Sequence, residues 1–212
     1  MRTLGLSILF LAAAGTACYA QQWEFGGTAG AGFLTGVPVT GVVGSATTGF
    51  KSGAAFGAFI GNDLYRHLSG ELHYGFLQSD LHIQSGGSDA SFAGVAHVVH
   101  YDLILHTSRS ESKVQFFAAA GGGMKIFRGT GKEAAYQPLS QYAYFTRTQA
   151  VKPMISVGGG IKYVIRRNIF LRTEFRDYIT PFPTELIAPA PGAKISGLLH
   201  DFVPMVGLSV VF

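Results

Sequence analysis

Residues 23–33 read Trp-Glu-Phe-Gly-Gly-Thr-Ala-Gly-Ala-Gly-Phe, and this stretch decides the fold. Its odd-numbered positions are apolar or small, with aromatic side chains at both ends, whereas its even-numbered positions hold Glu24, Thr28 and glycines. Alternation with a period of two predicts a β-strand. The run is longer than the usual strand of about 5 to 6 residues and matches the about 9 to 11 residues of a strand that crosses a bilayer. The stretch therefore predicts a membrane-spanning strand.

The same alternation recurs along the rest of the chain, in runs that lie within 54–60, 68–76, 95–105, 114–126, 155–163, 169–175 and 202–212. With the first strand they make eight, an even number, as a closed bacterial barrel in one chain requires. The connections alternate between short (61–67, 107–112 and 165–168) and long (35–52, 78–92, 128–152 and 179–197). Short periplasmic turns and long outer loops are typical of outer-membrane barrels. We therefore expect an all-β protein, an eight-stranded antiparallel transmembrane β-barrel, with both chain ends in the periplasm.

The composition is hard to reconcile with a soluble surface. Charged residues make up 13% of the chain and hydrophobic residues 48%, against about 25% charged residues in typical soluble domains. The abundance of Phe and Tyr argues against disorder. A single Cys excludes an intramolecular disulfide framework. The net charge of +4 is too mild to indicate nucleic-acid binding.

Residues 1–20 have the pattern of a secretory signal peptide. Arg2 precedes an apolar run over 4–14, and small residues lead to a cleavage site after Ala20. We therefore expect the outer-membrane β-barrel domain to span 21–212. Cys18 leaves open a lipoprotein cleaved just before it, although Gly15 stands where such signals usually carry Leu. No later apolar run reaches the roughly 18 residues that a membrane helix needs.

Several stretches resemble small eight-stranded outer-membrane β-barrels of the OmpA-like and opacity-protein type, namely 121–125 (Gly-Gly-Gly-Met-Lys), 158–162 (Gly-Gly-Gly-Ile-Lys), 171–176 and 206–212. The resemblance implies a monomer in the outer membrane of a Gram-negative bacterium, surrounded by lipid and lipopolysaccharide. It also implies a barrel-assembly machinery as partner, which would select the chain by its terminal Leu208, Val210 and Phe212. OmpA-like proteins often carry a peptidoglycan-binding domain after the barrel, and here we expect none after Phe212.

Charged and polar side chains fall on the inward-facing positions of three predicted strands: Glu71, His73, His100, Asp102, Arg172, Glu174 and Arg176. Buried charges need partners, so we expect Arg172 and Arg176 to face Glu71, Asp102 or Glu174. An eight-stranded barrel is just wide enough for side chains to fill it. The sequence thus favours a polar plug that holds the barrel shut. The alternative is a gate that exchanges Arg partners and passes small solutes.

The histidine spacing argues against a metal site or a cofactor. His97 and His100 point to opposite faces of a strand, and His100 and His106 share a face but lie about 20 Å apart. The sequence His106-Thr107-Ser108 has the His-x-Ser form of lipid A deacylase barrels, whose site lies at the outer-leaflet end. Here it falls at a periplasmic turn. We therefore expect no catalysis, with a lipid-modifying enzyme as a further alternative.

The long outer loops are where binding specificity is expected. The third of them carries aromatic and basic residues: Tyr136, Tyr142, Tyr144, Phe145 and Arg147. Such side chains suit an extracellular glycan or protein. The sequence therefore predicts a non-catalytic barrel with a structural or surface-interaction role.

Overall fold

The computed structural model describes residues 22–42, 44–107 and 113–212. The predicted signal peptide and Cys18 lie outside the described residues. Among the residues described, no helix is long and apolar enough to cross a membrane.

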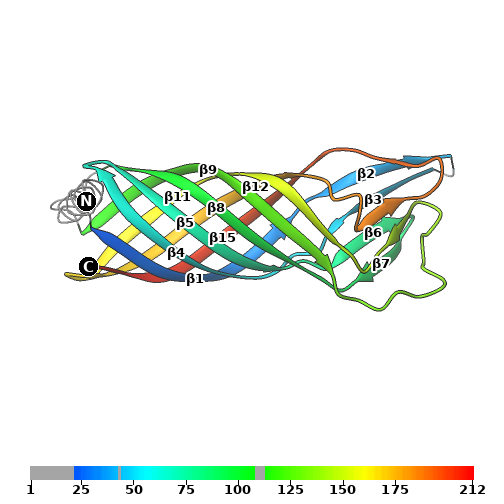
Figure 1. Cartoon of the computed structure of the whole chain (residues 1–212). Coiled ribbons are helices and arrows are strands. Elements are labelled where there is room, and N and C mark those ends of the chain that lie inside the picture. The colour runs from blue at the N-terminus through cyan, green and yellow to red at the C-terminus, as the bar shows by residue number, and fades with distance from the viewer. Residues whose placement is uncertain (1–21, 43, 108–112) are drawn as a thin grey trace, which may run out of the picture.

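Eight antiparallel strands close into a barrel (Figure 1), in the order β1-β15-β12-β11-β9-β8-β5-β4. This confirms the predicted all-β, eight-stranded fold. The barrel strands are β1 Trp23–Leu34, β4 Gly53–Tyr65, β5 Leu68–Gln78, β8 Gly94–His106, β9 Val114–Gly129, β11 Gln149–Arg166, β12 Ile169–Pro181 and β15 Leu198–Val211. Each predicted run lies on one of these strands, except that Phe212 follows the end of β15, and most strands extend several residues beyond the run.

The first and last strands pair to close the barrel. Phe25 lies opposite Val210 in the β1–β15 register. The backbone N–H of Trp23 donates to the carbonyl of Phe212 at 3.1 Å, and the N–H of Phe212 donates back at 3.0 Å. β1 therefore begins where β15 ends, and we call this the terminus end of the barrel (Figure 1).

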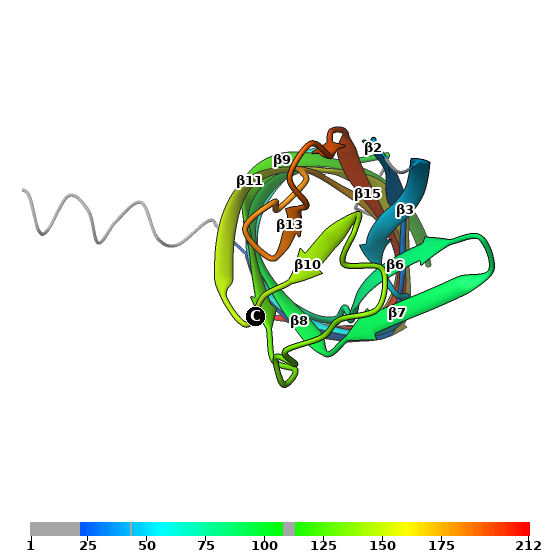
Figure 2. The same ribbon diagram turned by 90° about the vertical axis from the view of Figure 1, so that its right-hand side faces the viewer.

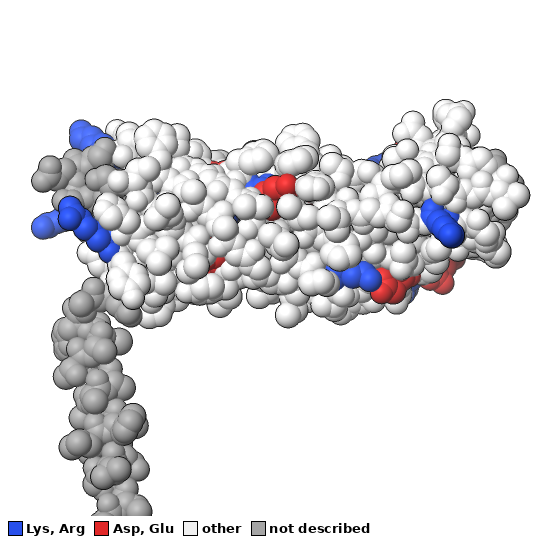
Figure 3. Space-filling view, turned by 90° about the horizontal axis from the view of Figure 1, so that it is seen from above, with Lys and Arg blue, Asp and Glu red and all other residues white. Residues whose placement is uncertain are grey.

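The outer face of the barrel is apolar. Its outward positions expose large hydrophobic side chains, among them Phe25, Phe56, Ile60, Leu72, Tyr101, Leu103, Phe116, Ile155, Phe175, Val206, Leu208 and Val210. In Figure 3 the visible face of the barrel carries few charged residues between its two ends. Such a surface suits hydrocarbon, because charges on a lipid-facing strand are destabilising.

The long connections contain further secondary structure, which the sequence analysis did not predict. They fold into further strands at the other end, the loop end (Figure 1): β2 Gly36–Gly41, β3 Gly44–Phe50, β6 Leu81–Ser85, β7 Ser88–Phe92, β10 Ala143–Phe145, β13 Ile187–Pro189 and β14 Lys194–Ile195. Five of them form one sheet, and β10 pairs with β13. β6 and β7 are joined by Gly86 and Gly87, whose positive φ angles of 55° and 83° suit the tight turn of a hairpin.

Buried apolar side chains hold these connections together. We call this group the loop core: Val37, Val39, Ala46, Phe50, Leu81, Ile83, Ala90, Phe92, Tyr142, Ala143, Phe145, Phe182, Leu186 and Ile187. It forms one continuous cluster with inward-facing residues of the barrel wall, including Leu77, Val98, Phe127 and Leu199. The ring of Phe50 stacks on that of Phe127 with centroids 5.0 Å apart. The connections are therefore anchored by packing inside the barrel at its loop end.

Candidate functional site

Arg172 on β12 is the centre of the ion pairs inside the barrel. Its Nη1 and Nη2 donate to Oε1 and Oε2 of Glu71 at 2.8 and 2.7 Å, and its Nε donates to Glu174 Oε2 at 2.9 Å. Both Arg172 and Glu71 are almost completely buried. The two carboxylates thus use three N–H groups of one guanidinium, a geometry that lysine cannot supply.

Arg172 is also held between two aromatic rings. Its guanidinium carbon lies 4.2 Å from the ring centroid of Phe59 on β4 and 4.5 Å from that of Phe117 on β9. Contacts of this kind strengthen when they are shielded from water. The rings therefore fix the guanidinium where both carboxylates can reach it.

Arg176 lies two inward positions beyond Arg172 on β12 and pairs with a second acid. Its Nη1 donates to Asp102 Oδ2, and its Nη2 donates to Glu174 Oε2 at 3.3 Å. Nδ1 of His100 lies 3.0 Å from the other oxygen of Asp102. The sequence-based expectation places Arg176 opposite an inward carboxylate, and the structure supplies Asp102 and Glu174.

The two histidines link the acids to each other. Nε2 of His73 lies 2.9 Å from Glu71 Oε2, and the rings of His73 and His100 stack with centroids 4.9 Å apart. All seven inward-facing residues named from the sequence are therefore brought together in one connected group.

Sequence reasoning missed two members of this group. Nζ of Lys162 donates to Glu24 Oε2 at 2.6 Å and to Glu71 Oε1 at 3.4 Å. Both residues occupy inward positions, Glu24 between Trp23 and Phe25 and Lys162 after the glycine run, so the same alternation could have found them. We call the full set the lumen charge network: Glu24, Glu71, His73, His100, Asp102, Lys162, Arg172, Glu174 and Arg176.

A separate buried pair, also missed, joins Lys125 on β9 to Asp201 on β15. Both side chains are completely buried. The Nζ of Lys125 lies 4.5 Å from the ring centroid of Phe127, which belongs to the same cluster as the loop core. This pair connects strands three places apart in the barrel order, next to the apolar part of the lumen.

Glycines on the inward positions leave room for these long side chains. A Cβ at Gly158 would lie 2.8 Å from Cδ of Arg176, and one at Gly121 would overlap the carboxylate of Asp102. The backbone oxygens of Phe175 and Tyr101 would lie closer still to these two Cβ atoms, so glycine is required there both by the neighbouring strands and by the ion-pair side chains.

The loop core adds apolar packing at the loop end of the barrel interior. Figure 2 looks onto the loop end and shows β10 and β13 lying across the barrel mouth. The backbone N–H of Thr146, just after β10, donates to the carbonyl of Leu186, just before β13, at 2.9 Å. The barrel interior thus holds ion pairs towards the terminus end and hydrophobic packing towards the loop end.

An exposed ion pair also fastens the connection between β12 and β13. Nζ of Lys152 on β11 donates to Glu185 Oε1 at 2.8 Å. This hydrogen bond lowers the pKa of Glu185 below its ordinary value. Glu185 is half exposed, so the pair is worth little in stability.

The structure divides the five candidate binding residues of the third loop. Tyr136, Tyr144 and Arg147 are exposed, Tyr136 to 80%. Tyr142 and Phe145 belong to the loop core, where Phe145 packs on Phe92 with ring centroids 5.9 Å apart. We therefore correct the expectation for Tyr142 and Phe145: they are packing residues, because Phe145 lies on the buried face of β10 and Tyr142, just before this strand, is buried in the same cluster.

The histidines outside the network have other partners. His106 is buried, and its Nε2 lies 2.8 Å from Ser69 Oγ, while Ser108 lies outside the described residues. His97 faces outward, with Nδ1 2.8 Å from the hydroxyl of Tyr74. Within 22–42, 44–107 and 113–212, no group of three or more His, Cys, Asp or Glu side chains is arranged to hold a metal ion.

Known structures with the same fold include three barrels. Neisserial surface protein A matches with a TM-score of 0.52 and 13% identity over 90% of this chain and 97% of its own. The N-terminal β-barrel domain of Pseudomonas aeruginosa OprF matches with a TM-score of 0.50 and 13% identity over 90% and 97%. Outer membrane protein AlkL, solved in lipid bilayers, matches with a TM-score of 0.52 and 13% identity over 92% of each chain.

These similarities confirm the fold class expected from the sequence, that of small outer-membrane β-barrels. No protein-family model and no curated protein sequence matches the chain.

Proposed function

We propose that this protein is a non-catalytic outer-membrane barrel of a Gram-negative bacterium, whose lumen is closed and whose loop end presents a binding surface outside the cell. The observation that carries the proposal is the packing inside the barrel, with ion pairs towards the terminus end and apolar side chains towards the loop end. Ion pairs across the barrel are formed by Arg172, Arg176 and Lys162. The loop core packs against the barrel wall nearer the loop end.

The ordered loop end supports an interaction role. Its connections form paired strands around a buried core, so a surface on them is already shaped before a partner arrives. A preformed surface loses less conformational entropy on binding than flexible loops do. Tyr136, Tyr144 and Arg147 are exposed there, and Tyr and Arg are enriched at the centres of binding sites.

Residence in the outer membrane has a direct test. The refolded barrel should migrate faster on a gel before heating than after it, and the protein should fractionate with outer membranes. Recovery as a soluble periplasmic protein would contradict the proposal.

The binding role is tested by substitution. The refolded protein is screened against extracellular glycans and proteins, and the variant Tyr136→Ala/Tyr144→Ala/Arg147→Ala should lose the binding that the wild type shows. Removing the whole of 130–150 is a poorer test, because it deletes part of the loop core and the start of β11. Tyr65→Ala is the matched control, since Tyr65 is 75% exposed at the terminus end. Equal binding by the triple variant would contradict this role.

A further inference from the structure

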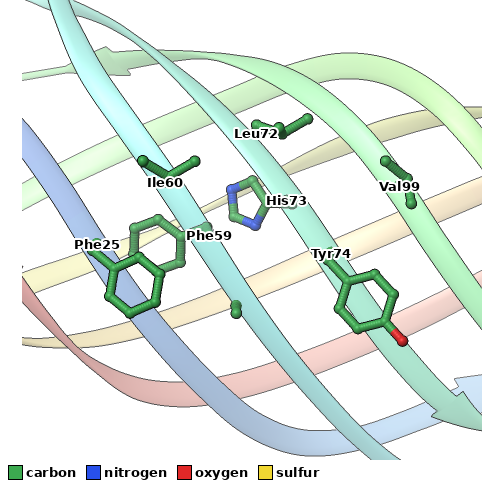
Figure 4. A pocket seen from close by; sticks show the side chains of 8 residues that line it. Phe25, Phe59, Ile60, Leu72, His73, Tyr74 and Val99 are labelled. Atoms are coloured by element: carbon green, nitrogen blue, oxygen red, sulfur yellow. The ribbon is translucent and has the colours of Figure 1, made fainter.

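A hollow of about 230 Å³ opens on the outer face of the barrel, across β1, β4, β5 and β8. Figure 4 shows the side chains around it, with Phe25 and Ile60 on one side and Leu72, Tyr74 and Val99 on the other. Its lining is almost wholly apolar. It is larger than the about 30 Å³ that one water molecule takes in the liquid, so it has room for several methylene groups.

The hollow exists because Ala58 is the one small side chain among the outward-facing residues that line it, with a glycine next to it on β1. Ala58 on β4 lies opposite Gly27 on β1. The next outward pair towards the terminus end is Phe25 and Ile60, and Ala58 lies opposite Tyr74 on its other side. Large side chains thus surround the methyl group of Ala58, and the neighbouring position on β1 carries no side chain. A Cβ built on Gly27 meets nothing closer than a backbone oxygen at 3.8 Å, so the space beside it is open.

The position of the hollow indicates which molecule fills it. It lies within the apolar outer face, where the neighbouring molecules are lipid tails. Phe25 follows Trp23 by two residues, roughly 7 Å along the strand, and Trp marks the membrane interface. The hollow therefore begins just inside the interface at the terminus end. If the chain ends lie in the periplasm, this is the leaflet built of phospholipid.

We propose that the hollow beside Gly27 and Ala58 binds one acyl chain of a periplasmic-leaflet phospholipid. The inference rests on the proposed residence in the outer membrane. An acyl chain lying there covers the rings of Phe25 and Tyr74 and fills a gap that a flexible tail fits better than a rigid side chain. The lipid is thereby held at one place on the barrel rather than exchanging freely around it.

The single tryptophan of the chain, Trp23, reports on this site. A phospholipid with brominated acyl chains is titrated into the refolded barrel in detergent micelles, and the fluorescence of Trp23 is followed. Bromine quenches on contact, so a bound chain should give quenching that saturates near one lipid per barrel. Quenching that rises in proportion to the lipid without a plateau would overturn the site while leaving membrane residence intact.

Filling the hollow provides the decisive comparison. Ala58→Phe should abolish the saturable quenching, and Gly27→Leu, which adds a large side chain opposite Ala58 on β1, should do so as well. The matched control is Ala120→Phe, an outward position of β9 that lies opposite Leu103 and Val157. The control should quench like the wild type. A saturable phase that persists in both filled variants would overturn the proposal, whereas a soluble protein that takes up no lipid would contradict the proposed function instead.

Discussion

Arg172 and Glu71 join opposite walls of the barrel through two parallel hydrogen bonds. Their strands, β12 and β5, are four places apart in the closed order of eight, as far as two strands can be. Backbone hydrogen bonds link only neighbouring strands. The Arg172–Glu71 pair therefore connects two strands that no backbone hydrogen bond joins. A buried ion pair adds little over a well-packed apolar core, but the loss of one partner leaves a charge stranded.

The first prediction concerns that loss. Arg172→Ala should reduce the free energy of unfolding by about 3 to 5 kcal/mol, because Glu71 and Glu174 remain buried with one cation fewer. The measurement is urea unfolding of the barrel in lipid vesicles. Arg167→Ala is the control, since Arg167 is exposed in the turn between β11 and β12. If both variants unfold like the wild type, Arg172 is not buried in an ion pair.

A second prediction tests the pairing itself. A double-mutant cycle of Arg172→Ala and Glu71→Ala should give a coupling energy within the about 0.5 to 3 kcal/mol typical of interacting residues. Arg172→Ala combined with Lys51→Ala should instead be additive within about 0.5 kcal/mol, because Lys51 pairs with Asp89 in the loop end. Additivity in the first cycle would show that the two side chains do not interact.

A third prediction separates packing from binding on β10. Phe145→Ala should open the loop end to proteolysis, because it leaves a cavity in the loop core. Tyr144→Ala, one residue away on the exposed side of the strand, should not. In both variants the barrel should keep its heat-dependent migration. Equal protease resistance of the two variants would argue against the loop core.

A fourth prediction concerns pH. The pKa of Glu185 should lie below its ordinary value because Lys152 donates a hydrogen bond to it. A lowered pKa in the folded state means that the ion pair stabilises above the unfolded pKa and that this stabilisation is lost as the pH falls through the folded pKa. Lys152→Gln should return the pKa towards 4.5, measured by NMR titration of the carboxyl carbon. Lys132→Gln, at another exposed lysine of the loop end, should leave it lowered, and an unchanged value in Lys152→Gln would exclude the pairing.

The barrel itself could be predicted because a membrane strand shows its two faces in the sequence. Trp23, Phe25 and Phe33 alternate with Glu24 and small residues, and the register follows that alternation. The same rule assigned Arg172 and Glu71 to the inside. Glu24 and Lys162 follow the same alternation, so their inward positions are predictable from the sequence as well.

The loop end could not be predicted in the same way. Its strands are short, and residues such as Val37, Val39 and Ile83 alternate over too few positions to stand out. Whether Tyr142 is buried and Tyr144 exposed depends on how β10 crosses the barrel mouth. That arrangement comes from contacts between connections that are distant in the sequence. One such contact joins Phe50 and Phe182, whose ring centroids lie 6.5 Å apart.

The closed lumen is the central claim, and single-channel recording in planar bilayers tests it most directly. The wild-type barrel should give no discrete openings. The lumen charge network and the loop core fill the interior one after the other along the length of the barrel, so an ion would have to pass both. Arg172→Ala should stay silent as well while unfolding more easily, since the loop core remains in place. Discrete openings of the wild type that grow in Arg172→Ala would contradict the account and identify the network as the gate of a narrow channel.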